Sequence, residues 1–324
     1  MLTVTDLSQI PWTANRQNGE RSVVTIGMYD GLHRGHRAVI AQVRARAKEL
    51  GAKSVVVTFD KHPMSIVRPD ATPKLLTSLD HKVSLLESTG VDATVVIGFD
   101  ADQSRETAVE FVERVLVNAL ATQLVIVGQD FHFGHMRQGN VTLLREMGER
   151  HDFVVEPMQL VPRADGIDEP VSSTAIRRAL AGGEIDLASR MLGRPHEVRG
   201  TVTTGDQRGR TIGFPTANVA IPVGMCLPAD GVYAGIYRRP DGIEHPCAIN
   251  LGRRPTFYDH QESSLLEAYL LDFAGDLYGE SAAVQFIAFL RSERQFGGVE
   301  ELKEQLVKDI EHARAAILAR RDQA

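Results

Sequence analysis

Two histidines spaced three residues apart are the first residues whose types and spacing point to chemistry. They are His33 and His36, within GMYDGLHRGH at positions 27–36. At the start of a helix, imidazole nitrogens and backbone N–H groups can both donate hydrogen bonds to phosphate oxygens. The segment also holds three glycines that let the backbone turn tightly and approach a ligand: Gly27, Gly31 and Gly35. We interpret it as a phosphate-binding turn; histidines that merely cap a strand-to-helix turn are the alternative.

Hydroxyl side chains and an arginine begin a second segment, VSSTAIRRAL, at 171–180. Ser173 and Thr174 can cap a helix there, and Arg177 lies one turn in. Plain helix capping would explain the segment if it stood alone. Together with the histidine pair, hydroxyls and a guanidinium at a helix start are typical of the second half of a triphosphate clamp.

Between these segments, GQDFHFG at 128–134 follows an apolar run. Asp130 and the two neighbouring phenylalanines suit a polar heteroaromatic ring, although an ordinary packed loop is the alternative.

A Gly- and Arg-rich stretch, GDQRGRTIGFPTANV at 205–219, could fold over phosphates. Gly205 and Arg210 are its candidate nucleotide-binding residues. Thr216 and Asn218 are two apart in an extended segment, so both side chains project to one side. A hydroxyl and an amide oxygen suit Mg²⁺ that also holds substrate phosphates. A turn with routine side-chain capping is the alternative.

Glu267, in LLEAYLLDF at 265–273, is a candidate general base. In a strand it would share a face with Leu265, Tyr269 and Leu271. A carboxylate among apolar neighbours is costly to bury without a role or a partner. It could accept the proton of a hydroxyl that attacks a phosphoryl group; an exposed edge-strand glutamate is the alternative.

The elements that must position these residues form two groups along the chain. Before about residue 185, apolar strand-like runs alternate with helical stretches, which predicts a parallel sheet covered on both faces, a Rossmann-like α/β domain. The strands are expected at 23–27, 55–59, 92–99, 124–128 and 153–157, and helices at 35–50 and 106–120. Ligands should bind beyond the carboxyl ends of the strands.

After Arg190 the pattern changes to short strands separated by Gly/Pro turns, typical of an antiparallel barrel or sandwich. The strands are expected at 193–202, 231–239, 245–252, 265–273 and 283–290. A terminal helix should pack on them through Val299, Leu302, Leu306, Ile310, Ala313 and Ile317. We expect two domains, 1–186 and 187–324.

Composition limits the function classes. The 324 residues carry a net charge of −6, and no basic stripe is concentrated in either half, which argues against a dedicated nucleic-acid-binding protein. A hydrophobic fraction of 43% fits a soluble globular protein. No signal peptide or membrane span is apparent. Cys226 and Cys247 have no paired spacing, so we expect a cytoplasmic protein without a zinc site.

The first-half segments GMYDGLHRGH, GQDFHFG and VSSTAIR resemble the adenylyltransferase module of the bifunctional bacterial riboflavin kinase/FMN adenylyltransferases, or FAD synthetases. Met28 and Tyr29 stand where that family usually has Asn and Phe. The ATP-phosphate ligands implied by the resemblance are His33, His36, Ser173, Thr174 and Arg177. The implied neighbours of the flavin are Asp130 and Phe133.

The second-half segments GRTIGFPTAN, PADGVYAG, NLGRRPTF and LDFAGDLYG resemble the riboflavin kinase module of the same family, in the same order. The resemblance implies a six-stranded barrel, Thr216 and Asn218 at a Mg²⁺–ATP site, and Glu267 as the base. Tyr269 stands where the family usually has His.

The sequence therefore predicts an enzyme that makes FMN from riboflavin and ATP, and FAD from FMN and ATP. Its expected partners are small-molecule substrates, with no nucleic acid and no membrane, and the sequence does not give the oligomeric state. Two alternatives are a nucleotidyltransferase of other specificity in the first module and a non-catalytic flavin-binding regulator. The intact set of polar residues argues against the second.

Overall fold

The structure is a computed structural model that describes residues 1–12, 20–163, 165–205, 208–254 and 263–321. Parts of two predicted segments, residues 206–207 and 255–257, lie outside the described residues. The chain divides into two compact units. Unit 1 comprises Met1–Pro73 and Leu79–Ser172, and unit 2 comprises Lys74–Ser78 and Ser173–Ala324. The boundary expected after residue 186 stays a prediction.

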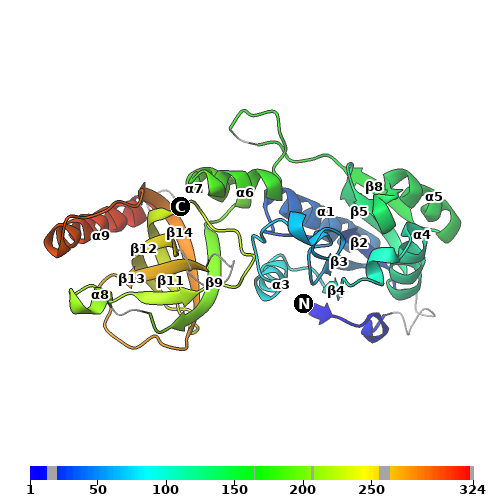
Figure 1. The fold of residues 1–324 in the computed structure, drawn as a ribbon. Coiled ribbons are helices and arrows are strands. Elements are labelled where there is room, and N and C mark those ends of the chain that lie inside the picture. The colour runs from blue at the N-terminus through cyan, green and yellow to red at the C-terminus, as the bar shows by residue number, and fades with distance from the viewer. Residues whose placement is uncertain (13–19, 164, 206–207, 255–262, 322–324) are drawn as a thin grey trace. The chain divides into compact units, whose positions relative to one another are not determined.

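Unit 1 is built on a parallel sheet of six strands in the order β1-β4-β3-β2-β5-β8 (Figure 1). Every pairing of neighbouring strands is parallel, which confirms the Rossmann-like α/β fold. The strands are β1 (Leu2–Val4), β2 (Ser22–Ile26), β3 (Lys53–Phe59), β4 (Ala93–Ile97), β5 (Thr122–Gly128) and β8 (Val154–Met158). A two-stranded ribbon follows β5, with β6 (His132–Phe133) and β7 (Gly139–Asn140).

Alternate side chains of the central strands enter different cores because successive residues of a strand face opposite ways. On one face, Val23 packs with α1, whereas Val24 on the other packs with α4, η5 and α5. Helix α3 shares the first face with α1. The helices of unit 1 are η1 (Leu7–Gln9), α1 (Arg34–Leu50), α2 (Met64–Val67), η3 (Pro69–Ala71), α3 (Leu79–Glu87), η4 (Gln103–Arg105), α4 (Ala108–Phe111), η5 (Val112–Ala119), η6 (His135–Arg137) and α5 (Val141–His151).

The helix expected at 106–120 consists of two parts. Its α-helical start, α4, is capped by Thr107, whose hydroxyl accepts from the N–H of Glu110 while the Glu110 carboxylate accepts from the N–H of Thr107. From Val112 to Ala119 the chain is a π-helix, η5. The apolar spacing that we used to predict a helix does not distinguish these two winding modes.

Unit 2 contains a closed barrel of six antiparallel strands, in the order β10-β13-β12-β11-β14-β9, which confirms the expected barrel. The strands are β9 (His196–Thr203), β10 (Ala217–Ala220), β11 (Gly231–Arg238), β12 (Glu244–Arg254), β13 (Ser263–Leu270) and β14 (Ser281–Arg291). The helices are α6 (Ser173–Ala181), α7 (Ile185–Leu192), α8 (Arg208–Thr211) and α9 (Val299–Arg321).

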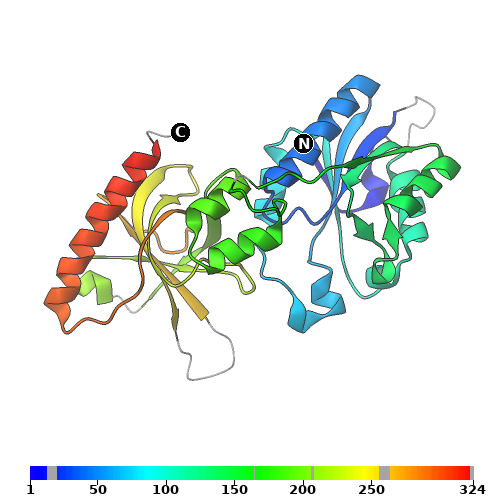
Figure 2. The same ribbon diagram turned by 90° about the horizontal axis from the view of Figure 1, so that it is seen from above.

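Helix α9 lies along the outside of the barrel (Figure 2). Of its predicted apolar stripe, Ala313 and Ile317 are buried against Ala234, Ile236 and Ile287. Val299, predicted to belong to that stripe, is instead 53% exposed, because it lies at the first turn of the helix. No helix in the described parts of the chain is both long enough and apolar enough to cross a membrane.

Candidate functional site

The strand order of unit 1 brings two predicted segments to one place. Strand β2 pairs with β3 on one side and β5 on the other, so the direction of the strand order reverses there. The carboxyl ends of strands at such a switch point are where open α/β sheets bind ligands. The loop after β2 contains His33, and the loop after β5 contains Asp130. The fold therefore places both predicted segments at the same edge of the sheet.

The loop between β2 and α1 holds an unusual backbone conformation. Tyr29, Gly31 and Leu32 have φ values of 51°, 78° and 37°, and two of these are not glycines. At the non-glycine residues Tyr29 and Leu32 such a conformation is strained and persists only where surrounding contacts impose it. Leu32 is fully buried, and the buried Tyr29 hydroxyl lies 2.6 Å from Thr25 Oγ1. A phenylalanine could not make that hydrogen bond, so the family departure at Tyr29 has a structural use here.

His33 is the N-cap of α1, a role that leaves both interpretations of the segment open. Its Nδ1 accepts a hydrogen bond from the N–H of His36 at 3.3 Å, and the two rings stack with centroids 3.6 Å apart. Because Nδ1 is the acceptor, a neutral His33 ring carries its proton on Nε2. Capping therefore leaves Nε2–H as a donor. A side chain at Gly35 would meet the His33 ring at 3.1 Å, which explains the glycine.

His36 has a ring that stays uncharged at neutral pH. Burial lowers its pKa well below the ordinary value, and the neighbouring His33 and Lys82 lower it further. Its Nδ1 is buried and has no hydrogen-bond partner among the described residues. The ring also packs edge-on against Tyr29 with centroids 4.9 Å apart. The pair can thus offer hydrogen bonds from neutral imidazoles, with the amides of a helix N-terminus behind them.

The predicted flavin neighbours have different surroundings. Asp130 is exposed directly after β5. Phe133 is only 8% exposed and belongs to the core, stacked on Phe131 with centroids 5.3 Å apart. Phe131 is the partly buried member of that pair.

Ser173, Thr174 and Arg177 belong to unit 2, whereas the histidines belong to unit 1. Ser173 and Thr174 open α6, as predicted, and Thr174 is exposed. The Arg177 Nε donates to the carbonyl oxygen of Lys74 at 2.5 Å. Both residues of this hydrogen bond, Arg177 and Lys74, belong to unit 2.

In the barrel, strand register brings Asn218 and Glu267 together. Asn218 of β10 lies directly opposite Glu267 of β13, and Glu267 lies opposite Asn250 of β12. Opposite residues project to the same side of a sheet. Ala248, two residues before Asn250 on β12, packs against the cluster that contains Ala313 and Ile317 of α9, so this face of the strands is the outer one. Asn218, Glu267 and Asn250 therefore form a polar row on the outer surface of the barrel.

This row corrects one sequence expectation. Glu267 was expected among apolar residues of its own strand, but Leu271 lies beyond the end of β13 at Leu270. The nearest neighbours on the outer face are the two asparagines of adjacent strands. Cross-strand neighbours are closer than residues two apart along a strand, and sequence periodicity does not reveal them. Tyr269 lies on the same face, with its ring centroid 5.8 Å from that of Phe214.

The loop before β10 closes over Asn218. The Asn218 side chain is 8% exposed, and its Oδ1 has no hydrogen-bond partner among the described residues. A Cβ at Gly205 would lie 2.4 Å from that amide group, and one at Gly209 would lie 2.3 Å from the Phe214 oxygen. A buried amide oxygen without a partner costs free energy unless a ligand satisfies it. Arg210 of the same loop is exposed.

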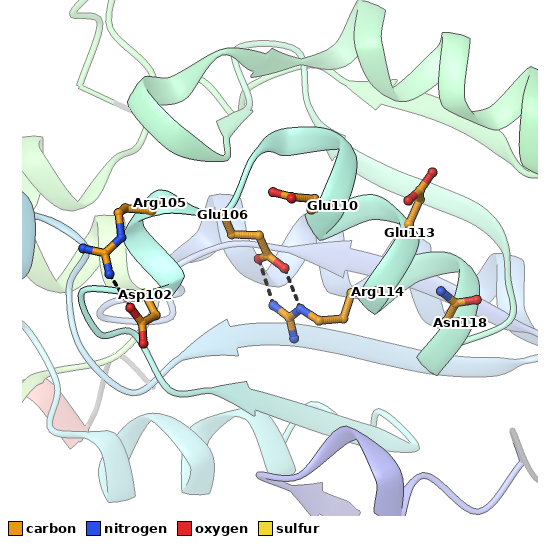
Figure 3. A pocket seen from close by; sticks show the side chains of 7 residues that line it. All are labelled: Asp102, Arg105, Glu106, Glu110, Glu113, Arg114 and Asn118. Carbon is orange, nitrogen blue, oxygen red and sulfur yellow. Dashed lines mark hydrogen bonds and ion pairs between the residues drawn. The ribbon is translucent and has the colours of Figure 1, made fainter.

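A shallow hollow of unit 1 contains none of the predicted site residues (Figure 3). Arg114 in this hollow donates to both carboxylate oxygens of Glu106, at 2.5 and 2.8 Å, and Arg105 pairs with Asp102. Since carboxylates outnumber guanidiniums there, the hollow does not favour a phosphate. The residues that line it are Asp102, Arg105, Glu106, Glu110, Glu113, Arg114 and Asn118.

Two family models together match most of the chain. Residues 15–175 match the family model for FAD synthetase, and residues 192–317 match that for riboflavin kinase.

Two curated relatives are both called bifunctional riboflavin kinase/FMN adenylyltransferase. The protein of Pseudomonas fluorescens is 41% identical over 293 residues, covering 90% of this chain and 92% of the relative. That of Listeria monocytogenes is 37% identical over 308 residues, covering 94% and 95%.

A solved structure from Streptococcus pneumoniae, described as a macrolide-efflux protein, superimposes with a TM-score of 0.82 at 27% identity. It covers 97% of this chain and 98% of its own.

Proposed function

The chain belongs to the family of bifunctional riboflavin kinase/FMN adenylyltransferases, and from that premise we propose which of its residues carry out each step. One activity transfers the γ-phosphoryl group of ATP to riboflavin and gives FMN. The other joins FMN to the adenylyl group of ATP and gives FAD and pyrophosphate. The substrates are small molecules.

For the kinase step, we assign the proton acceptor to Glu267. The primary hydroxyl oxygen of riboflavin attacks the γ-phosphorus, the bond from that phosphorus to the bridging oxygen breaks, and ADP leaves. The hydroxyl proton passes to the Glu267 carboxylate. The position of Glu267 directly opposite Asn218 is the observation that carries this assignment, because it places a base beside a buried, unsatisfied amide oxygen.

The residues beside Glu267 suit a magnesium ion. The Asn218 Oδ1 is an oxygen ligand without a partner among the described residues, and Thr216 supplies a hydroxyl two residues before it. Oxygen ligands together with substrate phosphates are what Mg²⁺ prefers, and the bound ion would neutralise phosphate charge. Gly205 and Arg210 would contact the nucleotide.

For the adenylyl step, a phosphate oxygen of FMN attacks the α-phosphorus of ATP, and the bond to the bridging oxygen of pyrophosphate breaks. This oxygen is already ionised near pH 7, so the step needs no strong base. His33 and His36 would donate hydrogen bonds to the phosphates, beside a backbone shaped by Gly27, Gly31 and Gly35. The β- and γ-phosphates would be bound by Ser173, Thr174 and Arg177. The flavin ring of FMN would lie near Asp130 and Phe133.

We also propose a cytoplasmic location. The sequence holds only two cysteines, without the paired spacing typical of proteins from oxidising compartments.

A reciprocal pair of variants tests the two-site assignment. Glu267→Gln keeps the side-chain shape but removes the proton acceptor, so riboflavin phosphorylation should fall about 10²- to 10⁴-fold. His36→Ala removes a phosphate donor, so FAD formation should collapse while FMN still forms. Chromatography of the flavins after incubation with riboflavin, ATP and Mg²⁺ reads both outcomes.

Mixing the two variants provides the control for folding. FMN made by His36→Ala can diffuse to Glu267→Gln, so the mixture should make FAD from riboflavin. Loss of FMN adenylylation in a folded Glu267→Gln protein would contradict the assignment.

A further inference from the structure

Lys82 is a buried lysine beside the adenylyl site that the sequence analysis did not single out. It lies on α3 and is only 3% exposed. Taking an ammonium group out of water is costly unless hydrogen bonds and opposite charges compensate for the lost solvation. Its partners therefore indicate what the residue does.

The ammonium group joins the ends of two neighbouring strands. Nζ donates to the carbonyl oxygen of Phe59 at 2.7 Å and to that of Met28 at 3.2 Å. Phe59 ends β3, and Met28 begins the loop that leads to His33. The Met28 oxygen also accepts from Thr58 Oγ1 at 3.1 Å. Met28 stands where the family usually has Asn, and both of these contacts are made to its backbone carbonyl rather than to its side chain.

Titratable groups of three elements surround the ammonium. Asp30, 3% exposed, lies in the loop after β2, and Asp60 lies just after β3; both carboxylates favour the charged form of Lys82. Asp60 is itself held by the N–H of Phe99 at 2.7 Å. His36 of α1 is close enough for the Lys82 charge to lower its pKa. Lys82 thus interacts with the loop and with the second histidine.

The loop that Lys82 contacts needs such support. Tyr29, Gly31 and Leu32 hold positive φ angles immediately before His33. A strained segment keeps one conformation only if contacts from elsewhere impose it, and a site residue must be held to within about half an ångström to function.

We propose that Lys82 is a positioning residue for FMN adenylylation: by binding the Met28 carbonyl and balancing Asp30, it holds the loop that presents His33 and His36 to the nucleotide. This inference rests on the proposed assignment of those histidines.

Steady-state kinetics of the full chain with FMN and ATP test the proposal. Lys82→Met keeps an unbranched side chain and removes the ammonium, so kcat/KM for ATP should fall about 10- to 100-fold, the usual effect of removing a group that orients a site residue. Riboflavin phosphorylation should not change. Lys48→Met, which alters an exposed lysine of α1, should leave both activities within about twofold.

The dependence of kcat/KM on pH shows whether the charge of Lys82 is needed or only the packing of its side chain. Burial lowers the pKa of Lys82 to about 8, against the raising effect of Asp30 and Asp60. In the unaltered protein, kcat/KM should therefore decline as the pH rises through about 8, where the ammonium loses its proton. The FMN phosphate is already ionised there and contributes no such decline. Lys82→Arg keeps its charge throughout, so its profile should be flat to about pH 9.5.

Three outcomes would overturn the inference: unaltered kcat/KM in Lys82→Met, an alkaline decline that persists in it, or an alkaline decline at pH 8 in Lys82→Arg. If the buried Trp12 of unit 1 reports by its fluorescence that Lys82→Met is unfolded, the Lys82→Arg profile decides alone. The His36→Ala variant distinguishes a failure of the proposed adenylyl site from a failure of the role assigned to Lys82. Full adenylylation in that variant refutes the proposed site, whereas its loss alongside a normal Lys82→Met refutes only the role of Lys82.

Discussion

At the scale of single residues, one side chain combines an observed structural role with a proposed functional one. His33 caps α1 with its Nδ1, and in the proposed adenylyl site its Nε2–H would donate to a phosphate. A glycine can also be required by a neighbouring residue of a proposed site. Gly205 is needed for space, because the loop backbone approaches the amide of Asn218 more closely than any side chain would allow.

We predict that Gly205→Ala impairs the kinase step. The new Cβ would lie 2.4 Å from the Asn218 amide, so the amide or the loop must move. A displacement on the order of 1 Å in a site can cost about 10²-fold. Riboflavin phosphorylation should therefore fall by about that factor, measured as kcat/KM, and FMN adenylylation should not change.

Gly298→Ala is the matched control. No heavy atom lies within 4 Å of a Cβ built at Gly298, and its φ is not in the left-handed region. This variant should keep full kinase activity. Equal activity of Gly205→Ala and Gly298→Ala would mean that the fit between loop and Asn218 is unimportant for catalysis.

At the scale of elements, register decides which side chains meet. Strands β10, β13 and β12 align three polar residues across the barrel exterior, although these lie far apart in the sequence. The interior is apolar apart from a few groups. One of them is His196 of β9, whose Nε2 lies 3.0 Å from the Cys226 carbonyl oxygen and whose ring stacks on Phe286.

His196 should make the barrel less stable in mild acid. Burial lowers the pKa of His196 from 6.5 to about 4. Between these values the unfolded chain binds more protons than the folded one, so stability is present above pH 6.5 and is lost as the pH falls toward 4. At pH 5 the loss should be about 2 kcal/mol relative to pH 7.

Hydrogen exchange of the β9 and β14 amides, expressed as protection factors at pH 5 and 7, measures this loss. His196→Gln can keep a donor to the Cys226 carbonyl but cannot titrate. The loss of stability of this variant between pH 7 and pH 5 should therefore be smaller by about 2 kcal/mol. The same pH dependence in both proteins would exclude His196 as the cause.

At the scale of the whole molecule, each unit has its own core, and sequence order does not coincide with unit membership. Lys74–Ser78 belongs to unit 2 although the chain on either side of it belongs to unit 1. Leu75 donates its N–H to the Gly224 oxygen and accepts from the Cys226 N–H, both at 2.7 Å. These hydrogen bonds tie the segment to the barrel unit.

We predict that a fragment beginning at Asp186 phosphorylates riboflavin and makes no FAD. Asp186 lies in the first turn of α7, which this fragment keeps almost whole. A fragment beginning at Ser173 also keeps α6, whose Leu180 oxygen accepts from the N–H of Ala229 at 3.0 Å. It should therefore unfold at a higher temperature, as measured by circular dichroism.

Both fragments lack the two hydrogen bonds to Leu75, so each should be less stable than the barrel in the full chain. A folded Ser173 fragment without kinase activity would show that the barrel unit is not sufficient for that step.

The amino-acid sequence by itself determined the fold class and the two reaction types. Apolar runs and helical periodicity are local patterns, so they predicted the parallel sheet, five of the six barrel strands and the terminal helix. The short strands β1 and β10 were not among the predicted strands. The segments around His33 and Thr216 are also local, because a glycine-rich turn and its ligand groups are contiguous in the chain.

Only the tertiary structure decided which distant residues meet. It placed Asn250 beside Glu267, buried Phe133 beneath Phe131, and brought Lys82 to the Met28 carbonyl. Lys82 reads in the sequence as an ordinary helix-surface lysine, with no local pattern that marks it as buried. The physical reason is that strand register and the burial of a charge depend on partners supplied by other elements, which the residues adjacent in sequence do not specify.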